Sequence, residues 1–386
     1  MPKPSDQRAS AAVSAMPGAV YTPFDLTNPQ RPVIALHVGD TWMEPFAGAR
    51  MEDLNERDFP GLHRYVDTRG IPALQGAIVQ KVRERNRLAC ERANVVVTAG
   101  ATSGLSCAIS ALADPGEELM ILAPFWPLIR GITRSLRATP VEVPFFDRVH
   151  TLADAIAALD AKFSQRTIAL YFSNPSNPTG RVLPVDWLEA IAAWTRAHDV
   201  WLLSDEVYED YVYAGEHISI ARFAPERTIS AFSFSKAFGM AGNRVGYLVG
   251  PEAVIAEAHK VSVHSAYHAP TAAQVAGLRA LEGGAAWVAN ARAAYAKAGN
   301  EAAAALGLPA PAGGCFLFAN VAHKLDARGL QGFLEDCFDA GVVVAPGSSA
   351  GEDYSTWVRL CFTVVPQALA VEAARRLAKL LVEPGG

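Results

Sequence analysis

Short apolar segments recur between residues 94 and 249, and most of them are rich in Val, Ile or Leu. Such segments are typical of buried parallel strands, and stretches with helical spacing occupy several of the gaps between them. We therefore predict an α/β fold in which helices cover both faces of a mostly parallel central sheet. The predicted strands are 94–98, 118–122, 139–143, 167–172, 200–204, 228–234 and 246–249, and the predicted helices are 103–112, 151–162 and 185–198.

Beyond Pro270 the pattern changes to alanine-rich helix, which breaks at Gly283 and Gly284 and resumes from 285 to about 306. Further strands are predicted at 315–320, 342–345 and 356–363, with helices at 331–340 and 366–382. This mixture predicts a second, smaller α+β domain. The first twenty residues are small, polar and proline-containing, which is typical of a mobile or loosely docked arm, and we expect ordered structure to begin near Val33. The expected division is an arm at 1–32, a small domain from 33–48 and 285–386, and a large domain at 49–284.

Composition agrees with a large globular enzyme, because 51% of the 386 residues are hydrophobic and 19% are charged. The formal net charge of -5 gives no reason to expect nucleic-acid binding, which usually requires a basic face. No uninterrupted apolar run approaches the ~18 residues of a membrane span. The first twenty residues also lack the apolar segment of a signal peptide, so we expect a cytoplasmic location.

Cysteine and histidine spacing argue against disulfides and metal ions. The five cysteines are far apart and lack any CxxC spacing, which favours buried small apolar side chains in a reducing compartment. His264 and His268 could share a helical face, but no carboxylate completes a zinc motif near them and a proline follows at position 270. We therefore expect no metal site.

Lys236 is the most informative residue of the chain. It ends a segment, from Thr228, that alternates apolar and small polar residues, and lysine is rare in surroundings with so little charge. Burial and a neighbouring cation disfavour a charged amine, which makes lysine a nucleophile toward a carbonyl at neutral pH. Ser233, Ser235 and Arg244 add polar and cationic groups suited to a phosphate. The alternative is a lysine that simply closes a strand at the surface.

The pattern Ser-x-Ser-Lys around Lys236, with the following Asn-Arg-x-Gly, resembles the cofactor-lysine segment of the class I/II aminotransferases. The run Asn-Pro-x-Asn-Pro-Thr-Gly that follows strand 167–172 is a strong mark of the same family. The resemblance extends from about residue 33 to the C-terminus. It implies a fold-type-I pyridoxal 5′-phosphate transferase, a homodimer with shared active sites, and Lys236 as the residue that forms a Schiff base with the cofactor.

Ligands of open α/β sheets bind outside the carboxyl ends of the strands, so the residues that follow each strand deserve particular weight. After strand 94–98 a glycine-rich turn opens a helix, and its backbone N–H groups suit a phosphate, although many such turns bind nothing. The resemblance implies that Ala101 and Thr102 belong to this phosphate cup. It also implies that the ring of Trp126 lies flat against the pyridine; the alternative is a tryptophan of the core.

The next two strand ends carry the polar contacts that the resemblance implies for the pyridine ring. Asn177 points an amide donor at the phenolic oxygen of the cofactor, and Tyr208 donates to the same oxygen. Asp205 keeps the ring nitrogen protonated, which lets the ring accept electrons from a substrate carbanion. Glu206 is the competing acid, and we expect it to be a supporting or solvated group.

Substrate binding requires an anchor for the α-carboxylate. Arg359 lies in an otherwise apolar strand and matches the family's carboxylate arginine, although an exposed edge-strand arginine is the alternative. The resemblance implies that Asn177 also contacts substrate and that Gly39 contributes a backbone contact, although Thr41 departs from the family's usual proline. Tyr65 matches a tyrosine that reaches across the dimer interface to the neighbouring phosphate.

The resulting prediction is an aminotransferase of amino acid metabolism that moves an amino group between an L-amino acid and a 2-oxo acid, with Lys236, Asp205 and Tyr208 as catalytic residues. The rivals are a carbon-sulfur β-lyase or another lyase, decarboxylase or synthase on the same scaffold, and a non-catalytic cofactor-binding regulator. Aspartate-type members bind the distal carboxylate with a partner-subunit arginine, and ungapped matching places His264 there. With the apolar residues Trp42, Met43 and Phe46 in the early loop, this favours a neutral, apolar or aromatic amino donor.

Overall fold

The computed structural model describes residues 10–14, 16, 18, 22, 24, 26 and 32–381. Most of the predicted N-terminal arm therefore lies outside the described residues, as does residue 382 of the last predicted helix. Within the arm, the short helix α1 (Ala11–Ser14) contacts α4 (Leu128–Ser135).

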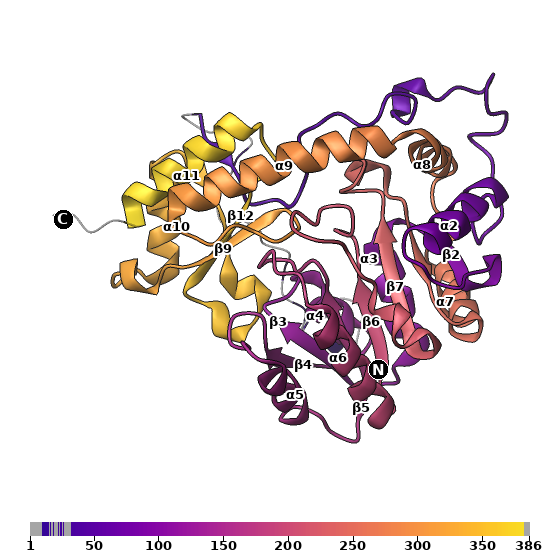
Figure 1. Ribbon diagram of the computed structural model, residues 1–386, viewed down its shortest axis with the longest axis horizontal. Helices are drawn as coiled ribbons and strands as arrows, with labels where there is room; N and C mark the ends of the chain where they lie inside the picture. Colours follow the sequence, from indigo (N-terminus) through magenta and orange to yellow (C-terminus); the bar gives the residue numbers. More distant parts are fainter. Residues whose placement is uncertain are drawn as a thin grey trace, which may run out of the picture.

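A seven-stranded sheet forms the larger part of the molecule, with the strand order β2-β8-β7-β6-β5-β3-β4 (Figure 1). The strands from β7 to β4 are parallel, whereas β8 is antiparallel to both of its neighbours. The prediction of a mostly parallel sheet is thus confirmed, and each strand lies within one residue of its predicted bounds. The strands are β2 (Val95–Thr98), β3 (Glu118–Ala123), β4 (Thr139–Pro144), β5 (Thr167–Ser173), β6 (Trp201–Asp205), β7 (Thr228–Ser233) and β8 (Gly246–Val249).

Helices cover both faces of this sheet, which explains why its strands are apolar on both sides. Alternate residues of each strand point to opposite faces, so Leu203 of β6 packs on one side and Leu202 on the other. The first face is covered by α3 (Gly100–Leu112), α4 and α7 (Glu252–Ala266). The second is covered by α2 (Pro72–Glu84), α5 (Leu152–Asp160), α6 (Val185–Ala197) and α8 (Thr271–Gly283).

Three of these helices, α2, α4 and α7, were not predicted from the sequence. Helix α2 begins at Pro72, a residue suited to the first helical turn because its missing N–H would have no partner there. Helix α3 also starts three residues before its predicted beginning at Ser103. Gly100 has a φ of +78°, a value that favours glycine, so the turn and the helix overlap at this residue.

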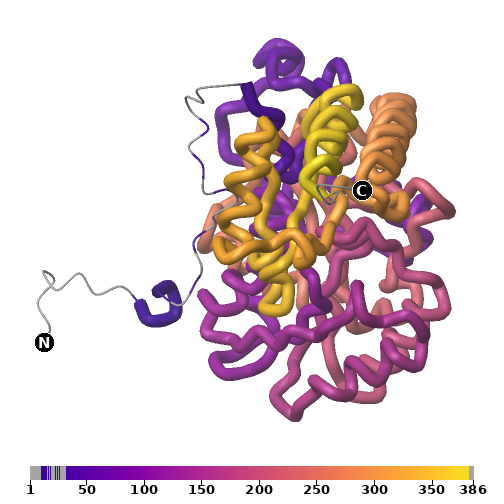
Figure 2. The backbone as a smooth tube through the Cα atoms, turned by 90° about the vertical axis from the view of Figure 1, so that its left-hand side faces the viewer, coloured from indigo at the N-terminus to yellow at the C-terminus, as the bar shows by residue number. Residues whose placement is uncertain are grey.

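The second group of elements contains a three-stranded sheet, β11-β12-β9, and the two-stranded pair β1-β10. The 22-residue helix α9 (Ala285–Leu306) packs along α11 (Gln367–Leu381), and α10 (Gly329–Asp339) completes the group. Figure 2 shows these orange and yellow elements gathered above the magenta strands and helices of the large sheet. The strands are β1 (Ile34–Ala35), β9 (Phe316–Asn320), β10 (Val342–Val343), β11 (Ala345–Pro346) and β12 (Trp357–Cys361).

The strand predicted at 342–345 is in fact two strands that belong to different sheets. Val342 and Val343 pair in parallel with Ile34 and Ala35, whereas Ala345 pairs antiparallel with Arg359. The change of partner at Val344 ties the segment around residue 34 to the C-terminal part of the chain. This agrees with a small domain built from both ends, while the exact boundaries stay predictions. Within the described chain no helix has the length and apolar character that a bilayer span requires.

Candidate active site

One cavity of about 130 Å³ collects most of the residues that the sequence predicts for the cofactor. They reach it from the ends of β2, β3, β5, β6 and β7, as expected for a ligand site of an open α/β sheet. The predicted residues that line it are Ala101, Thr102, Trp126, Asn177, Asp205, Tyr208, Ser233, Ser235, Lys236 and Arg244. Leu105, Val207 and Ala241 line it as well and were not predicted.

The spacing of Leu105 and Val207 could have identified them. Leu105 follows Ala101 by one helical turn on α3, so both side chains lie on the same helix face. Val207 lies between Asp205 and Tyr208, which were both predicted. The motifs at these strand ends are recognisable by their polar groups, whereas Leu105 and Val207 are apolar and resemble core residues.

Asp205 is a deeply buried carboxyl at the end of β6, with 4% of its surface exposed. Its burial raises the pKa from 3.8 to about 6, although two hydrogen bonds act in the opposite direction. The hydroxyl of Tyr171 donates to Oδ2 at 2.8 Å, and the N–H of Val207 donates to Oδ1 at 3.4 Å. The charge of Glu206 raises the pKa further. A cationic ligand group would favour the ionised form of this carboxyl.

Tyr208, Asn177 and Arg359 form a continuous hydrogen-bonded chain. Arg359 donates from Nη1 to the side-chain oxygen of Asn177 at 3.1 Å, and the Asn177 amide donates to the hydroxyl of Tyr208 at 3.4 Å. Arg359 is 5% exposed, so the alternative of an exposed edge-strand arginine is wrong. Its guanidinium lies 4.5 Å from the centre of the Phe316 ring and also donates to the His37 carbonyl at 3.0 Å. The chain connects β12 to the residues after β5 and β6.

Lys236 lines the cavity just after β7, and its Nζ donates to the carbonyl oxygen of Gly39. The prediction that Gly39 lies in the site is consistent with this contact. A Cβ atom at position 39 would lie 2.6 Å from Cζ of Phe316, so the close approach requires glycine. The carbonyl of Lys236 accepts a hydrogen bond from the hydroxyl of Tyr211 at 2.8 Å, which holds the segment that follows β7.

Arg244 lies against the glycine turn at the N-terminus of α3. A Cβ atom at position 100 would collide with the Arg244 guanidinium, and the guanidinium also donates to the Ala241 carbonyl at 2.7 Å. The backbone N–H of Ser235 is held by the hydroxyl of Ser233 at 3.0 Å. A guanidinium and the positive end of a helix dipole repel one another unless an anion lies between them. This part of the cavity is therefore suited to a phosphate.

Glu206 is a supporting group rather than a solvated one, because only 1% of its surface is exposed. Its Oε1 accepts hydrogen bonds from the hydroxyls of Ser219 and Ser230, both at 2.7 Å. His217 lies on its other oxygen, with Nε2 at 3.4 Å from Oε2. These partners hold the residue next to Asp205 in place.

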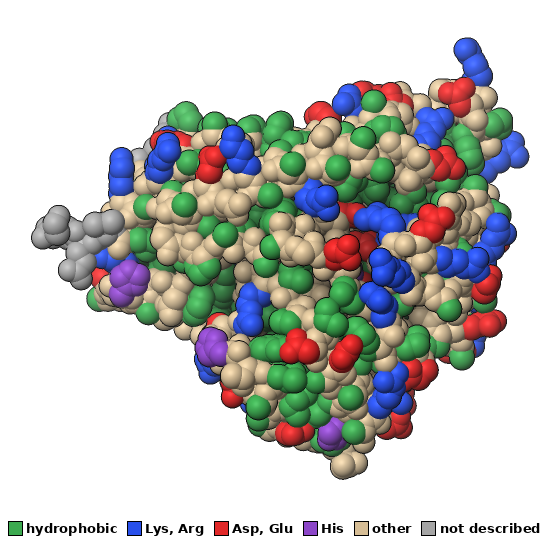
Figure 3. Space-filling model, viewed as in Figure 1, with side chains coloured by type: hydrophobic (Ala, Val, Ile, Leu, Met, Phe, Trp, Pro, Cys, Tyr) green, Lys and Arg blue, Asp and Glu red, His purple; other side chains and the backbone are tan. Residues whose placement is uncertain are grey.

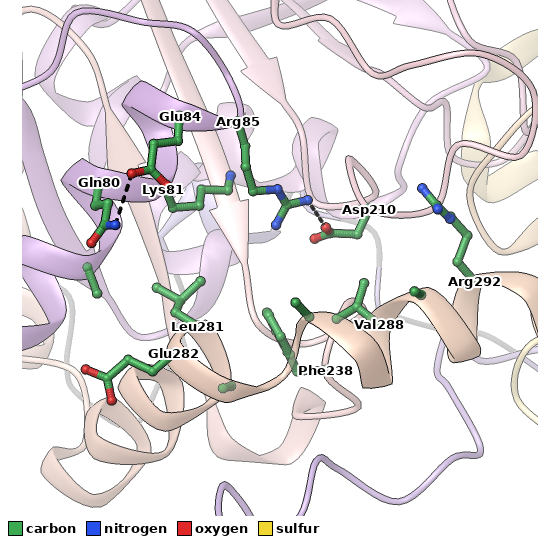
Figure 4. A pocket seen from close by; sticks show the side chains of 14 residues that line it. Gln80, Lys81, Glu84, Arg85, Asp210, Phe238, Leu281, Glu282, Val288 and Arg292 are labelled. Carbon is green, nitrogen blue, oxygen red and sulfur yellow. Dashed lines mark hydrogen bonds and ion pairs between the residues drawn. The ribbon is translucent and has the colours of Figure 1, made fainter.

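Two ion pairs hold the segment that follows β6. Lys81 of α2 pairs with Glu209, and Arg85 pairs with Asp210. Figure 4 shows the Arg85–Asp210 pair at a second cavity of about 490 Å³, which contains none of the predicted site residues. On the surface, Figure 3 shows positive and negative side chains gathered where α2 approaches the start of α9. The pairs fix the segment that carries Asp205 and Tyr208.

Tyr65 and His264 lie away from the cavity. Tyr65 is 81% exposed, and its ring contacts those of Tyr267 and His268 with centroid distances of 4.9 and 5.6 Å. His264 is exposed, and its Nδ1 lies 2.8 Å from the Lys260 carbonyl. The structure describes one chain, so the contact of Tyr65 with a partner's phosphate stays a prediction. All five cysteines are buried, as predicted, and the described residues hold no group of three or more metal-ligating side chains.

Residues 31–377 match the sequence profile described as aminotransferase class I and II. The chain belongs to this family. It is 35% identical to an aspartate/prephenate aminotransferase of Thermus thermophilus over 83% of this chain and 84% of that protein. It is 30% identical to aromatic-amino-acid aminotransferase 2 of Thermococcus litoralis, over 95% of this chain and 96% of that protein.

Among solved structures, the fold is similar to that of an aspartate aminotransferase of Thermus thermophilus with maleate. The TM-score is 0.82 at 31% identity, over 90% of this chain and 92% of the other. The fold is therefore that of a fold-type-I aminotransferase, as predicted. The family uses pyridoxal 5′-phosphate, so this chain is a pyridoxal-phosphate-dependent aminotransferase.

The cavity fits that cofactor on two independent observations. The carboxyl of Asp205 is buried at a site where a protonated ring nitrogen would compensate the cost of its charge. The Arg244 guanidinium lies against the α3 N-terminus, where a phosphate would relieve the repulsion between them. A ligand that carries a cation and an anion would stabilise both features.

Proposed function

We propose that this aminotransferase moves an amino group between a neutral, apolar or aromatic L-amino acid and a 2-oxo acid, and that Lys236 carries the cofactor through a Schiff base. The observation that supports it best is the convergence of Lys236, Asp205 and Tyr208 on one cavity. We further propose that it acts as a cytoplasmic homodimer in which Tyr65 contributes to the partner's site. The exposure of Tyr65 is compatible with that role.

The cofactor residues divide into three groups. Asp205 would hold a proton on the ring nitrogen, and Asn177 and Tyr208 would donate to the phenolic oxygen. The phosphate would be bound by Ser233, Ser235, Arg244 and the α3 N-terminus with Ala101 and Thr102, and the ring of Trp126 would orient the pyridine. When bound, pyridoxal phosphate supplies an aromatic ring that accepts electrons from the substrate.

The remaining residues act on the substrate. Arg359 pairs with the α-carboxylate, and its contacts with Asn177 and the Phe316 ring fix the guanidinium before substrate arrives. The amine of Lys236 would take the proton from the substrate Cα as a general base and deliver it, as a general acid, to the C4′ carbon of the cofactor. The carbonyl oxygen of Gly39 accepts a hydrogen bond from the same amine, so this backbone group lies next to the reacting nitrogen.

The charges around the cavity support a donor without a second carboxylate. Among the residues that line it, the cationic side chains are Lys236 and Arg244, and both already have a role. Leu105, Val207 and Trp126 offer apolar surface instead. The relatives named for aspartate/prephenate and for aromatic amino acids have similar identities of 35% and 30%, so their names alone do not decide between donors. A carbon-sulfur β-lyase is not favoured, because the matched relatives are named as aminotransferases.

The test is a panel of amino donors with 2-oxoglutarate as acceptor, in which kcat/KM is measured for phenylalanine, leucine, methionine and aspartate. We expect at least a tenfold preference for an apolar or aromatic donor over aspartate, because a second carboxylate would be buried without a cation. His264→Ala is the control, and it should leave the kcat/KM for phenylalanine unchanged. A clear preference for aspartate contradicts the proposed donor class. Release of pyruvate and ammonia from a β-substituted donor, without pyridoxamine phosphate, would instead indicate β-elimination.

A further inference from the structure

We propose that Tyr171 is a positioning residue for the reaction, and that its hydroxyl holds the Asp205 carboxylate in the orientation and charge state that bind the pyridine nitrogen. The inference rests on the proposed role of Asp205. Tyr171 does not line the cavity, so it would act only through Asp205.

The sheet register places the two residues together. Ser173 of β5 lies directly beside Asp205 of β6, and Tyr171 lies two residues earlier on β5. Residues two apart on a strand point to the same face, so the ring of Tyr171 lies below Asp205 on the face that α3 covers. Two residues span about 7 Å along a strand, a distance that a tyrosine side chain can cover. The hydroxyl donates to Oδ2 of Asp205 at 2.8 Å.

Both partners of this hydrogen bond are buried. Tyr171 is 0% exposed and Asp205 is 4% exposed. Among the described residues Asp205 is the hydrogen-bond partner of the Tyr171 hydroxyl. Burial, with the nearby charge of Asp205, raises the pKa of Tyr171 well above its usual range, so the hydroxyl stays protonated and always donates. The other donor to Asp205, the N–H of Val207, is 3.4 Å from Oδ1 and therefore weaker.

The bond favours the ionised carboxyl that a protonated ring nitrogen requires. Burial raises the pKa of Asp205, and the Tyr171 hydroxyl lowers it again. The other titratable groups near Asp205 are Glu206 and Tyr208 on its own segment, with Lys236 and Arg244 across the cavity. A hydrogen bond to a charged group is worth about one to two pKa units. Without the hydroxyl, more of the apoprotein would carry a neutral Asp205 at pH 5 to 7.

A purely structural role for Tyr171 makes a different prediction. A buried hydroxyl that only fills a polar position in the core would affect stability, and it would change cofactor affinity by the same factor at every pH. A hydroxyl that acts through Asp205 changes the affinity most where Asp205 titrates, and has little effect where Asp205 is ionised in both variants.

The test measures the dissociation constant of pyridoxamine 5′-phosphate from the apoprotein between pH 5 and pH 9. This probe cannot form a Schiff base with Lys236, so it reports the noncovalent contacts. We expect Tyr171→Phe to weaken binding about tenfold or more at pH 5 and less than about twofold at pH 9. The ratio of the two proteins' constants cancels the titration of the probe and of all groups that they share.

Tyr354→Phe is the matched control, because Tyr354 is also fully buried and also donates to a carboxylate, that of Asp147, at 2.6 Å. It removes the same kind of hydrogen bond outside the cofactor cavity and should leave the pH profile of binding unchanged. The double variant Tyr171→Phe with Asp205→Asn tests the route of the effect, since the loss caused by Tyr171→Phe should disappear when residue 205 cannot ionise.

The outcomes separate this inference from the function on which it rests. If Asp205→Asn alone leaves the affinity for pyridoxamine phosphate unchanged, the role of Asp205 is wrong. If Asp205→Asn weakens binding but Tyr171→Phe has no effect, or has the same effect at every pH and in both backgrounds, Tyr171 is not a positioning residue. A tenfold, pH-dependent loss that vanishes in the Asp205→Asn background supports the proposal.

Discussion

Replacing Asp205 by asparagine should stabilise the apoprotein at neutral pH while it weakens cofactor binding. The carboxyl is buried, and its pKa is raised from 3.8 to about 6. A raised carboxyl pKa means that the folded protein binds the proton more tightly than the unfolded chain, so stability falls as pH rises from about 4 through 6. The full difference is about 3 kcal/mol, at ~1.4 kcal/mol for each pKa unit.

About half of this loss in stability occurs within a pH range in which unfolding can be measured. With the two pKa values above, the contribution of Asp205 falls by about 1.4 kcal/mol between pH 5 and pH 8. Urea unfolding of the wild-type and Asp205→Asn apoproteins at several pH values measures this contribution. It equals the unfolding free energy of wild type minus that of Asp205→Asn. The exposed Asp114→Asn serves as the control. Parallel curves for wild type and Asp205→Asn between pH 5 and pH 8 would refute the reasoning.

Other predictions concern the support of the site, substrate binding and the dimer. Lys81→Met should destabilise the protein by about 3–5 kcal/mol in urea unfolding, because it leaves Glu209 buried without its main cation; a loss below 1 kcal/mol would contradict it. Arg359→Lys should raise the KM for amino donors about tenfold, since an ammonium lacks the bidentate fork, and unchanged KM values would exclude the pairing. Inactive Tyr65→Phe and Lys236→Ala chains should regain part of the activity when mixed as heterodimers, and full activity of Tyr65→Phe alone would rule out the shared site.

Residues that directly follow a strand could be predicted from the sequence. The end of an apolar segment is visible in the pattern, and the carboxyl ends of parallel strands meet at one edge of the sheet. Asp205, Asn177 and Lys236 lie at or just beyond predicted strand ends, the family resemblance implied their roles, and all three line the same cavity. Arg359 could be singled out as a cation in an apolar strand, and it is indeed buried beside Asn177.

Contacts that depend on strand register could not be predicted. Tyr171 lies within a buried strand, where a tyrosine is easily taken for a core residue, and only the pairing of Ser173 with Asp205 brings its hydroxyl to the carboxyl. The antiparallel orientation of β8 likewise depends on its partners. The switch of partner at Val344 joins two-residue strands, which are too short to carry a periodic pattern.

The unpredicted helices α7 and α4 differ in how clearly the sequence pattern indicates them. Val254, Ile255 and Ala258 of α7 are buried at helical spacing, so the sequence pattern does contain a signal for this helix. Helix α4 has eight residues, fewer than the length at which periodicity separates a helix from a strand.

The central claim is that Lys236 is the residue that carries the cofactor. Borohydride reduction of the holoenzyme fixes pyridoxal phosphate covalently to the amine that holds it, and peptide mass spectrometry then identifies that amine. We expect one modified site per chain, at Lys236, and no modification in Lys236→Ala, which should still bind pyridoxamine phosphate. Modification of a different lysine in the wild-type holoenzyme, or a reducible cofactor bond that persists in Lys236→Ala, would contradict the account.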